Sequence, residues 1–288
     1  MKSNAIIRIV LFSLAILILL GILLGSIAFD TFRTDFKSYV DRVGPTENLE
    51  QLHMDNFTAG IQNIEIEWVA GSITFQKDPG AIDISVLEYS PVDSEHRMVC
   101  KQSGQTLKIK YSEEDFGPIS FGVDVDISKD LVITVPANWT CNTLEIDVAA
   151  SEVVMEDLTI EEFDFDGASG ECRMTACDIG ELDIDTASGN VHFSGTLNTL
   201  DCDAASADCT IELINIPRSI KVDALSGDLD LILPPSAGFT CTLESMSSSF
   251  DSDFEFTMRG DEYIHGNGEC KIKLSALSGD VSIHKGIE

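Results

Sequence analysis

Acidic side chains recur at a regular spacing along this chain, and their pattern is the feature most able to support chemistry. They form two columns, at the second and fourth positions of a repeated segment described below. Carboxylate oxygens are the ligands that calcium prefers, so the fourth-position aspartates are candidate metal ligands: Asp147, Asp166, Asp185, Asp203 and Asp223. The fourth position also holds Glu67 and Glu244 and is broken by Ser275, and the second position holds Glu65, Glu145, Asp164, Asp183 and Asp201.

A column of like charges needs something to offset its repulsion. Neighbouring strands lie ~4.8 Å apart, and at that distance two like charges repel by ~1 kcal/mol even in water. We favour a structural offset, in which each fourth-position side chain accepts hydrogen bonds from backbone amides of the adjoining turn. Calcium bridging is the alternative, although no calcium-loop motif accompanies the acids. The sequence therefore predicts no cofactor, with calcium as the alternative to be tested.

The chain has eight cysteines, an even number that in an exported protein suggests disulfides. Four of them occupy positions that other segments fill with Val, Ile, Phe or Leu: Cys172, Cys202, Cys209 and Cys241. A buried cysteine packs as a small hydrophobic residue, so we expect core thiols there. Cys172 and Cys209 lie two repeats apart, too far to bridge, whereas Cys202 and Cys209 share one repeat and could be joined. The lack of a C-x-x-C pair argues against zinc and thioredoxin-type chemistry.

No arrangement of residues typical of an enzyme is present in the sequence. The five histidines are scattered along the chain, and there is no G-x-S-x-G, phosphate-binding loop or H-E-x-x-H motif. Carboxylate pairs are so numerous that they indicate a repeated structure and not a unique acid–base pair. We therefore predict no catalytic residues, no cofactor-binding residues and no enzymatic activity.

The acids are positioned by a repeat of ~19 residues. Its clearest copy, residues 182–193, has the alternating sequence LDIDTASGNVHF, which is typical of β-strands. In every copy an apolar residue or cysteine lies nine positions after the first, so the turn between the two strands has a fixed length. Ser-Gly fills this turn in four copies, and glycine suits a tight corner. The copies begin at Ile64, Leu144, Phe163, Leu182, Leu200, Ile220, Cys241 and Ile272.

Strands this short cannot bury their apolar faces alone, so successive copies must stack. Repeating the unit in one direction predicts an all-β fold, a right-handed parallel β-solenoid of strand–turn–strand repeats. An antiparallel β-sandwich is the alternative, which the near-constant repeat length disfavours. The repeat is irregular between residues 77 and 136, and residues 251–270 are expected to form an inserted hairpin on the surface.

The motif LDIDTASGNV, echoed by FDFDGASGEC and IKVDALSGDL, resembles the bacterial putative-adhesin family of β-strand-repeat proteins. The resemblance covers roughly residues 60–288. It implies a β-helix-like fold, a domain of unknown function without established enzymatic activity, and association with the cell envelope or its stress responses. The family offers no catalytic or binding residues to assign to this chain.

An uncharged apolar segment, Ile9–Phe29, lies near the N-terminus. As a helix of ~1.5 Å per residue it would span a ~30 Å hydrocarbon core. It exceeds the ~7–15-residue core of a secretory signal, so we favour an uncleaved transmembrane helix over a cleaved signal peptide. Lys2 and Arg8 favour a cytoplasmic N-terminus.

The predicted organisation is a cytoplasmic tail (1–8), a transmembrane anchor (9–29), a juxtamembrane stalk (30–57) and a β-strand-repeat domain (58–288). In the stalk, aromatic and aliphatic residues between Phe32 and Val43 recur at helical spacing, which suits either an amphipathic surface helix or a plain spacer. The predicted localisation is the cell membrane, with a single span and the repeat domain outside the cytoplasm.

The net charge of −31 excludes nucleic acid as a partner, because no basic stripe is available to neutralise phosphates. We expect a non-catalytic binding, adhesion or scaffolding module of the cell envelope that contacts a cell-surface protein or glycan and reaches the membrane through its span. One alternative is an accessory regulator in envelope-stress signalling. Another is a polysaccharide-active β-helix enzyme, which rests on fold analogy alone.

Overall fold

The computed structural model describes residues 50–58, 60–90, 97–113, 128–245 and 249–286. The chain divides into two units, Met1–Glu47 and Asn48–Glu288, and all described residues belong to the second. In these ranges the regular secondary structure consists of β-strands, without any helix. The prediction of an all-β repeat domain is confirmed.

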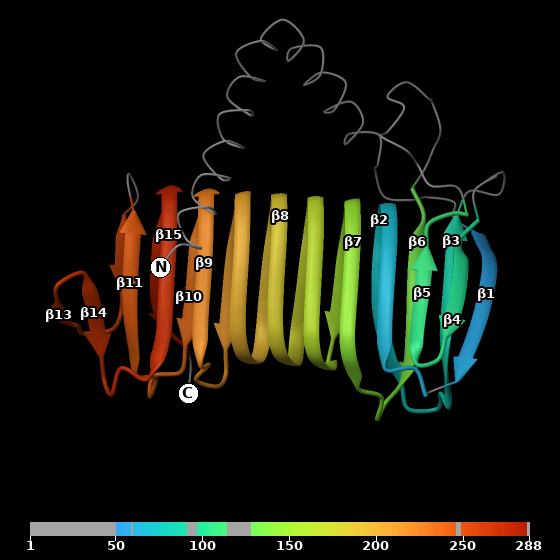
Figure 1. Cartoon of the computed structure of the whole chain (residues 1–288), viewed down its shortest axis with the longest axis horizontal. Coiled ribbons are helices and arrows are strands. Elements are labelled where there is room, and N and C mark those ends of the chain that lie inside the picture. The colour runs from blue at the N-terminus through green and yellow to red at the C-terminus, as the bar shows by residue number, and fades with distance from the viewer. Residues whose placement is uncertain (1–49, 59, 91–96, 114–127, 246–248, 287–288) are drawn as a thin grey trace, which may run out of the picture. The chain divides into compact units, whose positions relative to one another are not determined.

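The strands stand side by side along the length of the domain (Figure 1). In order they are β1 (Glu50–Thr58), β2 (Asn63–Asp78), β3 (Asp83–Ser90), β4 (Val99–Ser103), β5 (Thr106–Lys110), β6 (Asp130–Pro136), β7 (Cys141–Glu156), β8 (Thr159–Leu213), β9 (Ser219–Ser226), β10 (Leu229–Leu233), β11 (Phe239–Ser245), β12 (Phe250–Ser252), β13 (Thr257–Arg259), β14 (Glu262–His265), β15 (Cys270–Ser278) and β16 (Val281–Lys285).

Successive repeats pair in parallel and in register. Leu144 lies opposite both Ile64 and Phe163, and Leu200 lies opposite Ile220. The pairing continues around the corners, which is why β8 runs unbroken for 55 residues and contains three copies of the repeat. The regular part of the domain is therefore a parallel stack and not an antiparallel sandwich. The right-handed sense of its crossovers stays a prediction.

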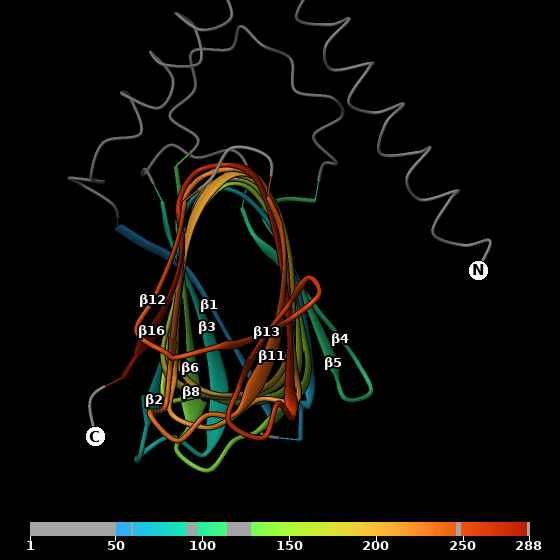
Figure 2. The ribbon, with the colours of Figure 1, turned by 90° about the vertical axis from the view of Figure 1, so that its left-hand side faces the viewer.

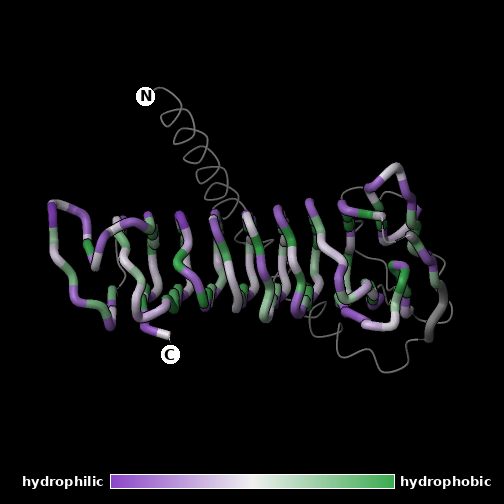
Figure 3. The backbone as a smooth tube through the Cα atoms, turned by 90° about the horizontal axis from the view of Figure 1, so that it is seen from below, coloured by the Kyte–Doolittle hydropathy of each residue, from purple (hydrophilic) through white to green (hydrophobic). Residues whose placement is uncertain are grey.

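Each repeat contributes one strand to each of two walls, which arch together at the corners when the domain is viewed end-on (Figure 2). We call them the first-strand wall, which carries the copies' first residues, and the second-strand wall, which carries the residues nine positions later. Hydrophobic and hydrophilic residues alternate along the strands (Figure 3). The first residue of every copy is buried, and so are Ile184, Val191 and Phe193. The core fills the space between the walls.

The Ser-Gly corners are held by contacts between neighbouring repeats. Ser188 Oγ donates a hydrogen bond to the carbonyl of Ala168 at 3.3 Å, and Ser169 makes the equivalent bond to Ala149. Gly189 has φ +125°, and a Cβ there would lie 1.8 Å from the carbonyl oxygen of Gly170. Glycine is therefore required by backbone conformation and by the close stacking of corners.

The last repeats are not stacked in sequence order. β15 pairs with β9 on one side and β11 on the other, and β16 likewise lies between β10 and β12. The copy that begins at Ile272 therefore fills a slot between the copies that begin at Ile220 and Cys241. A simple sequential stack predicts the opposite order and is wrong for this end of the domain.

Residues 253–269 lie on the surface, as expected, and cap the end of the stack. The hairpin of β13 and β14 pairs through β14 with β11, the outermost repeat. Its aromatic side chains pack over the end of the core, with Phe254 5.1 Å and Phe256 5.9 Å from Phe239 between ring centroids. The surface hairpin is as predicted, and its packing over the end of the stack is an additional finding. It covers apolar surface that the last repeat would otherwise expose.

The other end of the domain is closed by non-repeated strands. β4 and β5 form an antiparallel hairpin beside β2, while β1 and β3 extend the sheet beyond β6. β1 begins at Glu50, so residues 50–57 belong to the sheet and not to the predicted stalk. The boundary between stalk and domain therefore moves from residue 58 to about Glu50.

A buried ion pair lies inside this end. Lys129 Nζ donates to Glu88 Oε1 and to the Tyr111 carbonyl, both at 2.6 Å, and lies 3.8 Å from the centroid of the Tyr111 ring. Lys129 is 1% exposed and Glu88 is fully buried. Burial lowers the pKa of Lys129, and Glu88 opposes that shift.

The predicted anchor and most of the predicted stalk lie outside the described residues. In the part of the chain that is described, no helix is long and apolar enough to cross a membrane. The transmembrane helix, the cytoplasmic tail and the membrane localisation therefore stay predictions.

Candidate functional site

The outer surface of the first-strand wall carries the two acidic columns that the sequence predicts. Strand pairing aligns Glu67 with Asp147 and Asp147 with Asp166, and it aligns Asp203 with Asp223. The second position follows the same register, from Glu65 through Glu145 to Asp164 and later from Asp201 to Lys221. We call this surface the acidic face. Outward carboxylates of successive repeats thus lie beside one another.

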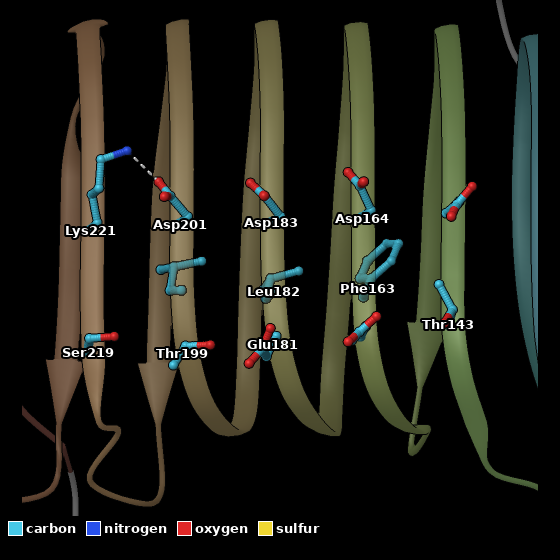
Figure 4. Close-up of a pocket in the computed structure, with 13 residues that line it drawn as sticks. Thr143, Phe163, Asp164, Glu181, Leu182, Asp183, Thr199, Asp201, Ser219 and Lys221 are labelled. Atoms are coloured by element: carbon cyan, nitrogen blue, oxygen red, sulfur yellow. Dashed lines mark hydrogen bonds and ion pairs between the residues drawn. The ribbon is translucent and has the colours of Figure 1, made fainter. Parts of the chain in front are cut away.

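Lysines border the acidic face at both ends. Lys108 and Lys110, on β5, pair with Glu65 and Glu67. At the other border, Lys221 Nζ lies 2.6 Å from Asp201, 3.2 Å from Asp223 and 3.4 Å from Asp203. Although burial alone lowers the pKa of Lys221, the surrounding carboxylates raise it overall. One cation therefore serves both columns, as Figure 4 shows for its contact with Asp201.

The centre of the acidic face has no such partners. Within the described ranges the structure shows neither a hydrogen bond nor an ion pair for the side chains of Asp147, Asp164, Asp166, Asp183 or Asp185. Partial burial is the largest cause that raises the pKa of four of these carboxyls, and neighbouring carboxylates add to it: Asp147, Asp164, Asp183 and Asp185. For Asp203 burial also raises the pKa, while Lys221 opposes the rise. The unpaired centre is a strained arrangement of like charges.

The expected capping of turn amides by the fourth-position acids is not formed among the described residues. That role belongs to acids directly before the second strand. Asp208 Oδ1 accepts a hydrogen bond from the Asp228 amide at 2.9 Å, and Asp228 Oδ1 accepts one from the Asp280 amide at 2.8 Å. Asp130 receives the Ser72 amide in the same way. Of these capping acids Asp228 follows a Ser-Gly pair, and that position is the sequence signal that could have identified it.

The metal hypothesis receives no geometric support from the described residues. They contain no group of three or more His, Cys, Asp or Glu side chains arranged to hold a metal ion. The side chains of Asp147, Asp166, Asp185, Asp203 and Asp223 stand in one column, one from each repeat. Calcium binding by these five residues stays a prediction that a melting experiment can test.

A shallow hollow of about 570 Å³ lies on the acidic face. Figure 4 shows its floor as rows of side chains that cross the strands, with Asp164, Asp183 and Asp201 in one row and Thr143, Glu181, Thr199 and Ser219 in another. Lys221 stands at one end of the acidic row. The hollow therefore offers many hydrogen-bond acceptors, several hydroxyl groups and a single cation. These groups suit binding by hydrogen bonds and charge.

The remaining candidate residues do not converge on this surface. His192 is half-exposed and lies 3.7 Å from Glu171 on the second-strand wall, and His284 contacts Asp253 near the C-terminal cap. The four cysteines predicted to face inward are buried, as are Cys141, Cys177 and Cys270. Burial raises the pKa of Cys141 and of Cys241 to about 12, so these thiols are not activated nucleophiles.

The chain's sequence matches that of a known family over most of the domain. Residues 61–284 match the family described as Toastrack DUF4097. The chain belongs to the Toastrack DUF4097 family. The predicted resemblance to bacterial adhesin-like repeat proteins is confirmed. Curated proteins provide no match to this Toastrack chain.

Several solved structures resemble this Toastrack domain at low sequence identity. A putative cell adhesion protein from Clostridium sporogenes is 12% identical with a TM-score of 0.39, covering 83% of this chain and 100% of its own. A putative adhesin from Bacteroides fragilis is 13% identical with a TM-score of 0.45, covering 83% and 98%. A putative lipid binding protein from Parabacteroides distasonis is 14% identical with a TM-score of 0.44, covering 84% and 98%.

Proposed function

We propose that this Toastrack chain is a non-catalytic binding module of the cell envelope and that the acidic face is its binding surface. The observation that carries the proposal is the unpaired centre of that face. Carboxylates held side by side, with neither cations nor turn amides to offset them, are destabilising in the free protein. A ligand that supplies positive charge or hydrogen-bond donors would relieve that repulsion on binding.

The chemistry of the face narrows the class of partner. Its many carboxylates disfavour anionic polymers and nucleic acid. Its hydroxyl groups and acceptors suit a basic segment of a cell-surface protein or a glycan that carries amino groups. No two carboxyl groups on the acidic face differ from the others in a way that would make them a general acid and a general base, because equivalent carboxylates recur from one repeat to the next. We therefore favour recognition over hydrolysis.

We further propose that Ile9–Phe29 anchors the chain in the cell membrane and that the repeats wind as a right-handed solenoid outside the cytoplasm. The length and apolar composition of Ile9–Phe29 support the anchor. The parallel register of successive repeats supports the winding. Protease accessibility of the domain in intact cells tests the placement, since a cytoplasmic domain would be protected.

The binding proposal can be tested with the full chain in detergent. We would measure binding of a decalysine peptide by fluorescence anisotropy and of amino-containing cell-wall glycan by sedimentation. Replacing Asp164, Asp183 and Asp185 together by Asn should weaken binding of at least one probe about tenfold or more, because a ligand that neutralises several carboxylates loses part of each contact. Binding should also weaken as salt increases.

A matched control replaces three acids on the other wall, Glu152, Glu171 and Glu212, by Gln. This variant changes the net charge by the same amount and should leave binding unchanged. Equal losses in both triple variants would show that net charge alone attracts the probes. Release of glycan fragments by the chain would contradict the non-catalytic proposal.

A further inference from the structure

Two cysteines of one repeat meet inside the core. Cys202 lies on the first-strand side of the third copy within β8, and Cys209 follows seven residues later on the second-strand side. Their Sγ atoms are 3.9 Å apart, and the two residues are 0% and 2% exposed. The thiols of Cys141 and Cys177 instead contact backbone carbonyls, and the Cys100 thiol contacts the side chain of Asp55. The contact between Cys202 and Cys209 joins two thiols. This contact is therefore of a different kind.

The two positions face each other in every repeat, but only this repeat places cysteine at both. Elsewhere the same pair is, for example, Ile146 with Val153, or Phe165 with Cys172, all buried. A lone cysteine in either column replaces a hydrophobic residue without further consequence. Two facing cysteines can instead join covalently across the core.

We propose that Cys202 and Cys209 form a disulfide that ties the two walls of the domain together. The sulfur atoms must approach from 3.9 Å to about 2.05 Å. The corner between them favours this approach, because it is lined by small buried residues, Ala204 and Ala207. The same position holds larger residues in some copies, such as Trp68, Val148 and Thr186, and small ones in others, such as Gly167, Ala224 and Ala276. The walls can therefore draw closer here than at the bulkier corners.

The reaction is a thiol–disulfide exchange with a low-molecular-weight or protein disulfide as oxidant. The thiolate of one cysteine attacks the oxidant's S–S bond and releases one thiol. The thiolate of the second cysteine then attacks the resulting mixed disulfide and releases the other thiol. The two protons lost by Cys202 and Cys209 end on the two released thiols.

Both sulfurs are buried, so the exchange must take place while the repeat is open, during folding or unfolding. An oxidant is expected where the repeat domain lies outside the cytoplasm, so the occurrence of the bond in cells rests on the proposed localisation. Its formation in purified protein does not. The experiment therefore uses purified full chain in detergent with oxidised and reduced glutathione.

The chain would be unfolded in guanidinium, refolded in the glutathione mixture, and then denatured in an alkylating reagent. We expect six of the eight cysteines to be alkylated and the intact mass to be about 2 Da lower before alkylation. Cleavage before Asp203 and Asp208 should give peptides that contain Cys202 and Cys209 and separate only after reduction. Alkylation of all eight, or a bridge that joins other cysteines, would overturn the proposal.

Two variants make the result specific. Cys202→Val places at 202 the residue that another copy carries at Val222, and all seven of its thiols should be alkylated. Cys172→Val alters the same column as Cys209 but removes a thiol that faces Phe165, and five of its seven thiols should be alkylated. Oxidised wild-type chain should also melt several degrees above reduced chain, a difference that Cys202→Val abolishes. Protection of two thiols in Cys202→Val would contradict the assignment.

Discussion

The end of the domain that β1, β3, β4 and β5 close holds a buried ion pair, whereas the centre of the acidic face holds unpaired charges. At that end Lys129 and Glu88 are buried, and Lys129 Nζ lies 2.6 Å from Glu88 Oε1. On the acidic face, carboxylates such as Asp183 and Asp185 stand in rows without a cation. A buried charge cannot persist unless it is paired, whereas water screens an exposed one. The domain therefore depends on electrostatic pairing for its stability at Lys129 and Glu88, and it tolerates repulsion between carboxylates on the acidic face.

The largest effect is expected from breaking the buried pair. Lys129→Met would leave Glu88 charged and without its cation in the core, which should lower the free energy of unfolding by about 3–5 kcal/mol. Guanidinium denaturation followed by circular dichroism would measure it. Combining Lys129→Met with Glu88→Leu removes both charges and should recover much of the loss. A loss below about 1 kcal/mol in the single variant would show that the stability of this end of the domain does not depend on the ion pair.

A smaller effect is expected where the acidic face has its shared cation. Lys221→Met removes the partner of Asp201, Asp203 and Asp223 and should destabilise the domain by about 1 kcal/mol, the upper range for exposed pairs. High salt should reduce the difference. Lys273→Met is a matched control, since Lys273 lies in the neighbouring strand and, among the described residues, forms an ion pair with one carboxylate, that of Glu244 at 3.8 Å. Equal effects of both substitutions would argue against a special role for Lys221.

The acidic centre also predicts a pH dependence of stability. The pKa values of Asp147, Asp164, Asp183 and Asp185 are raised in the folded state, so the folded domain binds protons more readily than the unfolded chain. Their contribution is fully present below the unfolded pKa and is lost as pH rises through the folded values. The melting temperature should therefore rise as pH falls from 7 toward 4.5. A fall across this range would contradict the proposed repulsion.

The smallest effect is expected from a single change in the centre. Asp185→Asn removes one of the repelling charges and should stabilise the domain by about 0.5 kcal/mol. Asp166→Asn should act in the same direction. Millimolar calcium provides a companion measurement, because a bound ion would raise the melting temperature of wild-type chain more than that of Asp185→Asn. No change with calcium would remove the metal hypothesis.

The sequence predicts the regular part of this domain well because its information is local. Alternation along residues 182–193 determines which side chains face inward, and the nine-residue offset determines where the second strand begins. The acidic columns follow directly from that phase. The hydrogen-bond partners of these acidic side chains cannot be predicted from the phase of the repeat, because they depend on the distance between each side chain and the neighbouring corner.

Contacts between residues that are far apart in the sequence could not be predicted from it. Lys129 and Glu88 are 41 residues apart, and nothing in the residues around either one indicates a partner. The order of the last repeats is equally hidden, because the short link between Leu233 and Phe239 does not reveal that the chain leaves room for a further repeat. Only the pairing of β15 on both sides discloses it. The contact between Cys202 and Cys209 is consistent with the sequence, because both residues lie in one repeat.

The slot filled by β15 and β16 has a consequence for biosynthesis. Most repeat proteins can lose a terminal repeat and keep a shorter, intact stack. Here β15, which follows both β9 and β11 in the sequence, completes an interior position with neighbours on both sides. A chain that stops before Cys270 would have a gap between β9 and β11, with unpaired strand edges facing each other. A chain truncated before Cys270 should therefore be cleaved by proteases more readily than the full-length chain.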